Sequence, residues 1–436
     1  MNQAATMEAA QPCRRSLPLL LLASTWLFLL SDGGGSTPPP LRRADDALHP
    51  VVLLPGYTCS QIDARLGEDY EPPPPPTAGC AAARDGKKRW FRLWENGTAL
   101  GEPRAAPCYA DQLRLVYDAG RGDYRNVAGV RTRVVSFGTT RGFGNHLGKD
   151  NCMAKVVRAL EGVGYKEGVN LFGAPYDFRY APAPPGKNAT VFSSFVADLR
   201  RLLEHASRKN GGKPAILVTH SFGGVMAVEF LTRSTAHVKH LVMTSTGAGG
   251  VVVALGSLAA SASAPPLSMA RTARSYATAF LPVPSPAVFG DAPLVVTRRR
   301  NYSAHDMAEF LAAVGFSDEE IGLYRARALP VTLGLGAPRV PTTAINGVGV
   351  ATPEQLVYWD GDFSKAPEVV YGDGDGVINL ASALALDTMI GDNPEQSFFK
   401  SVKIANVTHG GMITEELALK RVISEILEAN RANYRK

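Results

Sequence analysis

The sequence lacks several features that would assign it to a particular class of protein. Beyond residue 31, no stretch reaches 18 apolar residues without a charge or a breaker, so we expect no membrane span in the body of the chain. Lys and Arg form only short runs, such as 298–300, and the 46 basic residues are mixed with 40 acidic ones. This pattern argues against a nucleic-acid partner, although the net charge of +6 allows a mild attraction to anionic lipid. No cysteine follows residue 152, and no internal repeat is visible.

The N-terminal segment has the pattern of a secretory signal peptide. Arg14 and Arg15 precede an apolar stretch at 16–31, and the sequence DGGGSTPPP follows it. This apolar stretch is short for a membrane span, which needs about 20 residues. We therefore expect a signal peptide at 1–32, a linker at 33–48 and a secreted or lumenal body. An uncleaved signal anchor that attaches the protein to a membrane is the alternative.

Two further features agree with a secretory route. Glycosylation motifs of the type Asn-x-Ser/Thr occur at Asn96, Asn188, Asn301 and Asn406. Four cysteines follow the expected signal peptide, namely Cys59, Cys80, Cys108 and Cys152. In an oxidising compartment one pair could bridge, and a Cys80–Cys108 bridge would close a loop of moderate length.

Strand-like and helix-like segments alternate through most of the chain. The apolar runs at 49–56 and 214–220 are typical of buried strands, and 193–209 is typical of an amphipathic helix. A final section repeats the pattern with PTTAINGVG, PEVVYGDGDG and SVKIANVTHGG, followed by a helix from about 414 to 431. The alternation predicts an α/β fold whose parallel sheet is buried on both faces.

Two regions interrupt this alternation. Residues 57–125 lack clear periodicity and contain a run of five prolines, so we expect an excursion from the sheet. The alternation then resumes at residue 130 with the strand-like VRTRVVSF. Residues 247–295 are rich in Ala, Ser, Gly and Pro, a composition that suits a mobile cover better than a core.

Ser221 lies where a strand-like run meets an apolar-periodic stretch, in the sequence THSFGG. This sequence is close to the Gly-x-Ser-x-Gly nucleophile elbow, in which a sharp strand-to-helix turn exposes the serine hydroxyl and requires small neighbours. Thr219 stands where the motif has its first glycine, and Gly223 keeps the second. A serine at a strand end without any chemistry is therefore the alternative.

An α/β-hydrolase also needs an acid and then a histidine at the ends of later strands. Asp373 and Asp375 follow a β-branched run in a glycine turn, and His409 follows another strand-like run. A calcium loop beginning at Asp373 is excluded because Val377 and Leu384 would occupy its fifth and twelfth positions. We therefore expect no metal and no cofactor. The two aspartates both stay candidates for the acid on this reasoning.

An oxyanion hole needs two backbone N–H donors. The residue after the nucleophile, Phe222, would supply one of them. The other should come from the loop after the first strand, where the sequence PGYTCSQ follows the apolar run, and Tyr57 is our prediction for it.

Five motifs resemble the lecithin:cholesterol acyltransferase family, and its plant-type members in particular. They are HPVVLLPGYTCSQIDARL, APYDFRY, VTHSFGG, INGVGVATPEQLVYWD and VVYGDGDGVINL, in this order between residue 49 and about residue 412. The resemblance implies an α/β-hydrolase fold over 49–436, with a membrane-binding cap at about 57–125 and a lid at about 247–295. It also implies a catalytic triad of Ser221, Asp375 and His409.

The resemblance extends to the cap, with some departures. It implies a Cys80–Cys108 disulfide that encloses Trp90 and Trp94, with Trp94 near the substrate. Animal members have a second cysteine pair near the C-terminus, which this chain lacks. The chain reads GYTCSQI where many members read GNLGNQL, and STGAGG where they read APWGG.

The activity that the resemblance implies is acyl transfer through a serine acyl-enzyme. A phospholipid would supply the acyl chain, and a sterol or another lipid hydroxyl would accept it, which makes the protein an O-acyltransferase. With water as the acceptor it would be a phospholipase A. A non-catalytic lipid-binding protein that retains the fold is the alternative of another class. The enzyme would contact a membrane surface peripherally through Trp90 and Trp94, unless these two side chains form the cap's own core.

Overall fold

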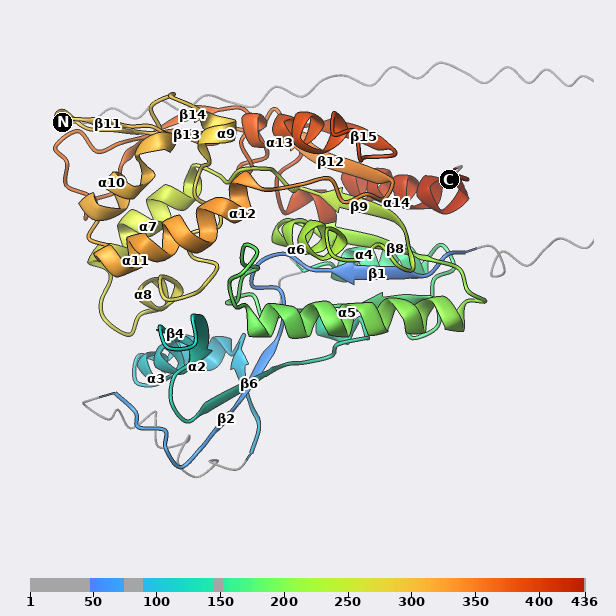
Figure 1. Cartoon of the computed structure of the whole chain (residues 1–436), viewed down its shortest axis with the longest axis horizontal. Coiled ribbons are helices and arrows are strands. Elements are labelled where there is room, and N and C mark those ends of the chain that lie inside the picture. The colour runs from blue at the N-terminus through green and yellow to red at the C-terminus, as the bar shows by residue number, and fades with distance from the viewer. Residues whose placement is uncertain (1–47, 74–88, 144–151, 435–436) are drawn as a thin grey trace, which may run out of the picture. The chain divides into compact units, whose positions relative to one another are not determined.

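Six parallel strands form the central sheet (Figure 1). The computed structural model describes residues 48–73, 89–143 and 152–434, so the expected signal peptide at 1–32 lies outside the described residues. Neighbouring strands follow the order β15, β12, β9, β8, β1 and β7, and each pair is parallel. Their bounds are β1 Val51–Leu54, β7 Leu171–Gly173, β8 Ala215–His220, β9 Val238–Thr244, β12 Thr342–Val348 and β15 Phe399–Ala405.

Helices cover both faces of this sheet because its strands are apolar on both sides. In β1, Val51 and Leu53 join the core cluster of α4 and α14, whereas Val52 and Leu54 join that of α5 and α6. The helices are α4 Ala154–Glu161, α5 Thr190–Lys209, α6 Phe222–Leu231 and α14 Glu416–Arg431. A parallel sheet with helices on both faces confirms the predicted α/β-hydrolase fold. In the described part of the chain, no helix is long and apolar enough to cross a membrane.

A smaller antiparallel sheet takes two of its strands from the region expected to form the cap, about 57–125, and its third strand from residues beyond that region. Its strands follow the order β3, β2 and β6, with bounds β2 Ile62–Leu66, β3 Phe91–Trp94 and β6 Val130–Val134. The hairpin β4 Leu115–Asp118 and β5 Asp123–Asn126 accompanies it, with the helices α2 Gly97–Gly101 and α3 Ala106–Leu113. The strand expected from residue 130 is therefore present as β6, but it pairs with β2 and not with the central sheet. Its alternating sequence has only one apolar face, which suits an antiparallel sheet exposed on one side.

A buried ion pair in the motif APYDFRY connects this small sheet with the central domain. The Arg179 side chain is fully buried, and its Nε and Nη2 donate to the Asp177 carboxylate at 2.9 and 2.6 Å. Arg179 also donates to the Leu113 carbonyl at the end of α3 and to Thr132 Oγ1 in β6. A buried guanidinium needs such partners for its N–H groups. The motif thereby fixes the position of α3 and β6 on the loop that follows β7.

Residues 247–295 contribute to a core, although their composition suggested a mobile cover. They form α7 Val253–Ser263, α8 Met269–Ala273 and α9 Pro286–Phe289. Leu255, Phe280 and Leu281 are buried in one cluster with residues of the helices that follow. Those helices are α10 Met307–Ala313, α11 Asp318–Leu323 and α12 Leu329–Leu333. The many small residues of 247–295 therefore accompany close packing.

A four-stranded sheet, in the order β11, β10, β13 and β14, lies outside the central sheet. Its bounds are β10 Val295–Val296, β11 Asn301–Tyr302, β13 Thr352–Val357 and β14 Glu368–Gly372, and α13 Leu380–Leu386 follows it. The strand expected before the GDGDG turn is β14, which is antiparallel to β13. No residue of β14 is fully buried, so it differs from the doubly covered strands among which the sequence had placed it.

A disulfide joins Cys59 and Cys152, which are 93 residues apart in the sequence. It connects the segment between β1 and β2 with the segment that precedes α4. The sequence did not favour this pair, because the bridge that seemed most plausible from spacing and from resemblance was Cys80–Cys108. Cys108 is also disulfide-bonded. Cys80 lies outside the described residues, so the Cys80–Cys108 pairing stays a prediction.

Candidate active site

The turn at Ser221 has the strained backbone of a nucleophile elbow. It joins β8 directly to α6, and Ser221 has a φ of 54° and a ψ of −128°. This conformation is sparsely populated for residues other than glycine and is typical of functional turns. Gly223 is required here, because a Cβ on it would lie 2.5 Å from the Pro55 carbonyl oxygen. Thr219 is fully buried within β8, before the turn begins, so the elbow tolerates its side chain.

Ser221, His409 and Asp375 form a continuous chain of hydrogen bonds. His409 Nε2 lies 3.0 Å from Ser221 Oγ, and His409 Nδ1 lies 2.9 Å from Asp375 Oδ2. Because a carboxylate only accepts, Nδ1 carries the proton and Nε2 is free to accept from the serine hydroxyl. An imidazole held in this way can take the proton of the hydroxyl when the oxygen attacks an electrophile.

The geometry separates the two candidate aspartates. Asp375 is buried, its Oδ2 accepts from His409, and its Oδ1 accepts from the N–H groups of Val377 and Ile378. Asp373 is exposed, and its carboxylate accepts from the Gly349 N–H instead. Only Asp375 can therefore orient the imidazole. In the described part of the chain, no three His, Cys, Asp or Glu side chains are grouped as a metal ion would need.

His220, next to the serine, supports the loop that carries His409. Its Nε2 lies 3.1 Å from the His409 carbonyl oxygen, so Nε2 carries the proton and donates. Burial, and secondly the nearby His409, lower the pKa of His220 to about 3. The ring is therefore neutral at physiological pH, and it holds the loop without adding a charge beside the imidazole of His409. No sequence pattern could indicate this contact, because the partner is a backbone carbonyl 189 residues away.

Two backbone N–H groups near Ser221 have no hydrogen-bond partner within residues 48–73, 89–143 and 152–434. Phe222 is the first residue of α6, and Tyr57 belongs to the loop after β1. Among the described residues, neither N–H has a hydrogen-bond acceptor. The loop passes close to the serine, because a Cβ on Gly56 would lie 3.3 Å from Ser221 Cβ. The oxyanion hole at Phe222 and Tyr57 stays a prediction, and the unpartnered N–H groups agree with it.

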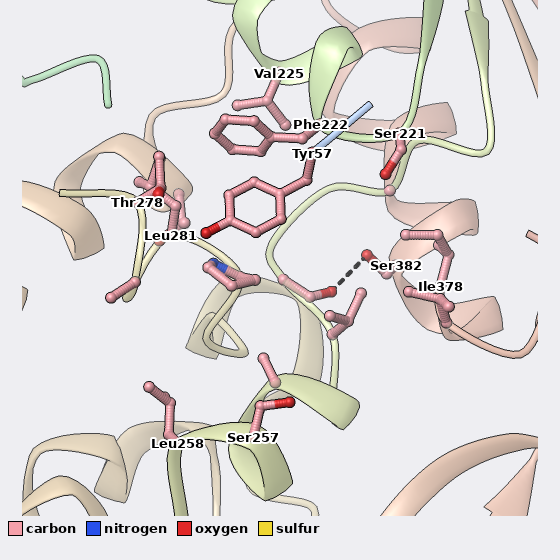
Figure 2. A pocket seen from close by; sticks show the side chains of 18 of the residues that line it. Tyr57, Ser221, Phe222, Val225, Ser257, Leu258, Thr278, Leu281, Ile378 and Ser382 are labelled. Carbon is pink, nitrogen blue, oxygen red and sulfur yellow. Dashed lines mark hydrogen bonds between the residues drawn. The ribbon is translucent and has the colours of Figure 1, made fainter. Parts of the chain in front are cut away.

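A pocket of about 460 Å³ opens beside Ser221. Figure 2 shows Ser221 and Phe222 at one end, and Leu258 of α7 at the other. Most of the lining side chains are apolar, among them Leu281 and Ile378. A cavity of this size and character can hold an acyl chain away from water.

Tyr57 forms part of the pocket wall beside the serine. Its ring lies edge-on to those of Phe178 and Phe222, with centroids 5.3 and 5.9 Å away, and its hydroxyl points toward Thr278 (Figure 2). Although 38% of the Tyr57 residue is accessible, its phenol is largely shielded from bulk water. This burial raises the pKa of Tyr57 to about 12. The phenol is therefore neutral and available as a hydrogen-bond donor at physiological pH.

The two tryptophans expected to contact substrate or membrane occupy different surroundings. The Trp94 indole N–H donates to the Thr58 carbonyl at 2.7 Å, and its ring lies edge-on to Phe178. Trp94 therefore supports the loop that carries Tyr57. Trp90 is half-buried, with the guanidinium groups of Arg65 and Arg133 centred 5.3 and 4.3 Å from its ring. The contacts of Trp94 agree with the alternative in which the tryptophans form the cap's own core. The membrane role of both residues stays a prediction.

The four glycosylation motifs also differ in their surroundings. Asn188, Asn301 and Asn406 are exposed. Asn96 is half-buried and caps α2, because its side chain accepts from the Ala99 N–H. Glycosylation stays a prediction at all four positions.

Comparison with known proteins identifies relatives over most of the chain. The family model described as "Lecithin:cholesterol acyltransferase" matches residues 90–279. "Lecithin-cholesterol acyltransferase-like 1" of Oryza sativa subsp. japonica is 46% identical over 393 residues, which cover 88% of this chain and 87% of the relative. The Arabidopsis thaliana protein of the same description is 36% identical, with coverage of 87% and 90%. The human "Lysosomal phospholipase A and acyltransferase" is 29% identical, with coverage of 77% and 80%.

Proposed function

Because the chain belongs to the lecithin:cholesterol acyltransferase family, we propose that it moves a fatty acyl chain from a phospholipid to a lipid hydroxyl group. Relatives described as acyltransferases and as a phospholipase support an enzyme of this kind. The observation that carries the proposal is the hydrogen-bonded chain of Ser221, His409 and Asp375 at the edge of an apolar pocket.

In the first half of the reaction, Ser221 Oγ attacks the ester carbonyl of the phospholipid. His409 Nε2 takes the hydroxyl proton, and Asp375 stabilises the imidazolium that forms. The negative oxygen of the tetrahedral intermediate accepts from the N–H groups of Phe222 and Tyr57. His409 then gives its proton to the departing alkoxide of the lysophospholipid, and the acyl group stays on Ser221 as an ester.

In the second half, an acceptor hydroxyl attacks this ester. His409 takes the acceptor's proton and returns it to Ser221 Oγ, which releases the new ester and restores the enzyme. If water is the acceptor, the product is a free fatty acid and the enzyme acts as a phospholipase A. The apolar lining of the pocket favours a lipid alcohol, because it limits the access of water to the acyl-enzyme.

A product assay tests this function directly. The enzyme is incubated with phosphatidylcholine vesicles, with and without a sterol, and lipids are measured by mass spectrometry, with the Ser221→Ala variant as the control. We expect lysophospholipid and sterol ester in equal amounts when the sterol is present. Free fatty acid in place of sterol ester would support phospholipase A. Absence of both products, with lipid binding intact, would support the non-catalytic alternative.

We also propose that the protein follows the secretory route. The Cys59–Cys152 bridge and the exposed motifs at Asn188, Asn301 and Asn406 support an oxidising compartment. Treatment of the protein purified from its natural source with a peptide N-glycosidase tests the proposal. A shift to lower mass is expected, and an unchanged mass together with free thiols would contradict it.

A further inference from the structure

Hydroxyl groups interrupt the apolar lining of the pocket beside Ser221. Apart from Ser221, the serine and threonine side chains among the described residues of this lining all donate to a backbone carbonyl. They are Thr246, Ser257, Ser261, Thr278, Thr332 and Ser382. These hydroxyl protons are therefore used within the fold. The other hydroxyl of the described lining is the phenol of Tyr57.

The Tyr57 phenol begins a chain of hydrogen bonds that leads away from the pocket. Its hydroxyl is paired with that of Thr278. Thr278 Oγ1 donates to the Phe178 carbonyl at 2.9 Å, so it can accept the phenol proton but has no proton left to give. Burial raises the pKa of Tyr57 to about 12, so the phenol keeps its proton at physiological pH. The phenol oxygen can therefore still accept from a donor in the pocket.

The charged groups that act on the phenol do not supply such a donor. They are Asp177 and Arg179, which form a buried ion pair with an N–O distance of 2.6 Å. The remaining side-chain hydrogen bonds of Arg179 go to the Leu113 carbonyl and to Thr132 Oγ1. Because the two charges neutralise each other, this part of the pocket suits a neutral group that donates a hydrogen bond, such as an alcohol, better than an ion.

The position of the phenol indicates which substrate it would meet. Figure 2 shows its hydroxyl pointing toward Thr278, on the side of the ring away from Ser221. Edge-on contacts with Phe178 and Phe222 hold the ring in this orientation. An acceptor alcohol must bring its hydroxyl to the acyl carbon on Ser221 Oγ, so the same hydroxyl cannot bind the phenol. A hydroxyl group bound by Tyr57 therefore belongs to the acyl chain, which extends past Tyr57 into the pocket.

We propose that the Tyr57 phenol binds a hydroxyl group on the acyl chain, so that the preferred acyl donor is a phospholipid with a hydroxylated fatty acyl group. The bound hydroxyl donates to the phenol oxygen, Tyr57 donates to Thr278, and Thr278 donates to the Phe178 carbonyl. Elsewhere in the apolar lining a hydroxyl without a partner would be destabilised. The proposal rests on the proposed function, because it takes the pocket as the site of the acyl chain.

A competition assay tests this preference. Vesicles contain equal amounts of two phosphatidylcholines, one with unsubstituted acyl chains and one whose chains carry a hydroxyl in the first, middle or last third. Mass spectrometry gives the ratio of hydroxylated to unsubstituted acyl product, from which any change in overall rate cancels. For at least one hydroxyl position the wild type should favour the hydroxylated chain. Tyr57→Phe, which removes the hydroxyl and keeps the ring, should lower that ratio about tenfold, the effect of losing one hydrogen bond between uncharged groups.

Thr332→Val is the matched control, because the Thr332 hydroxyl also lines the pocket but donates to the Leu329 carbonyl within α12. Its product ratio should equal that of the wild type. If Tyr57→Phe fails to fold, Thr278→Val should still lower the ratio about threefold, because it removes the group that orients the phenol. An unchanged ratio in the Tyr57 variant would overturn the proposal, and so would an effect confined to the choice of acceptor alcohol. A keto chain favoured as strongly as the hydroxylated one would also contradict it, because a ketone cannot donate.

A binding measurement separates this proposal from the proposed function. Hydroxystearic acid and stearic acid are titrated into Ser221→Ala and into Ser221→Ala/Tyr57→Phe by calorimetry. The first protein should prefer the hydroxylated acid about tenfold more strongly than the second does. A wild type that transfers no acyl chain, together with this difference in binding, would overturn the proposed function alone. An active wild type without this difference in binding or in product ratio would overturn the hydroxyl site alone.

Discussion

The candidate active site and the outward face of the small sheet β3, β2 and β6 differ in how their charged groups are partnered. At the site, the carboxylate of Asp375 is buried and accepts from His409 and from two backbone N–H groups. On the outward face of the small sheet β3, β2 and β6, the carboxylate of Asp63 accepts from Arg92 and Arg133. Arg65 and Arg131, which lie opposite each other, have no acidic partner in the described part of the chain. The hydrogen bonds of the candidate site are therefore satisfied within the protein, whereas the outward face of the small sheet keeps positive charge without an acidic partner in the described part of the chain.

Replacing the members of the hydrogen-bonded chain should have the largest effect. Ser221→Ala should abolish acyl transfer, and His409→Ala and Asp375→Asn should each lower kcat by at least about 10³-fold, because each removes the nucleophile, the base or the group that orients the base. Steady-state kinetics on a phospholipid and on a short ester measure these losses.

Asp373→Asn is the matched control for the acid. The Asp373 carboxylate accepts from the Gly349 N–H and is exposed, so kcat should fall less than about fivefold. If this variant proves more damaging than Asp375→Asn, the carboxylate has been assigned to the wrong residue.

The Cys59–Cys152 bridge connects the segment between the loop of Tyr57 and strand β2 with the segment that precedes α4. Cys59→Ser/Cys152→Ser should lower the free energy of unfolding by about 4.6 kcal/mol, the value expected from the chain entropy that a loop of this length gains in the unfolded state. Denaturant unfolding of both proteins without reductant provides the comparison. An unchanged midpoint would mean that the bridge stabilises neither region.

Gly223→Ala tests how closely the elbow is packed. The new Cβ would meet the Pro55 carbonyl oxygen, so we expect a loss of about 1–3 kcal/mol in stability together with reduced activity. Gly322→Ala, in α11, is the control, because a Cβ there meets nothing within 4 Å and alanine favours a helix by up to about 1 kcal/mol. Equal behaviour of the two variants would contradict the argument from packing.

Lowering the pH should reduce the stability of the folded protein through its buried histidine His240. Burial, and secondly Lys239, lower the pKa of His240 to about 3, so the folded protein resists a proton that the unfolded chain accepts below about pH 6.5. Stability should therefore fall as the pH decreases from about 6.5 toward 3, by about 1.4 kcal/mol per unit for this histidine.

His240→Gln isolates this effect away from the active site. Between pH 6.5 and 5, its stability should fall by up to about 2 kcal/mol less than that of the wild type, as measured by denaturant unfolding at each pH. A pH dependence identical to that of the wild type would show that His240 does not resist protonation in the folded state.

Much of the fold could be predicted because the central strands are apolar on both sides. The continuous apolar runs around Leu53 and Leu217 are typical of strands in a parallel sheet that is covered on both faces, and both residues are fully buried. β6 and β14 were assigned to the wrong sheet, because a short alternating segment shows that a strand forms but not which strand it pairs with. Residues 247–295 contribute to a core, which their composition did not indicate, because composition alone does not distinguish small residues that pack closely from residues that do not pack. The role of this stretch as a lid stays a prediction.

The candidate site was easier to predict than its surroundings. Ser221, Asp375 and His409 each stand beside glycines at the end of a strand-like run, which is a local pattern. The contact of His220 with the His409 carbonyl and the Cys59–Cys152 bridge depend on distances in the folded chain, which no local pattern records. The four arginines on the outward face of the small sheet likewise come together only when β2, β3 and β6 are paired.

Labelling with a fluorophosphonate tests the central claim most directly, because this reagent reacts with a serine hydroxyl that a neighbouring base has activated. The account predicts that the wild-type protein is modified once, that peptide mapping places the label on Ser221, and that Ser221→Ala and His409→Ala are not labelled. Labelling at another serine, or labelling of Ser221→Ala to the same extent as the wild type, would contradict it.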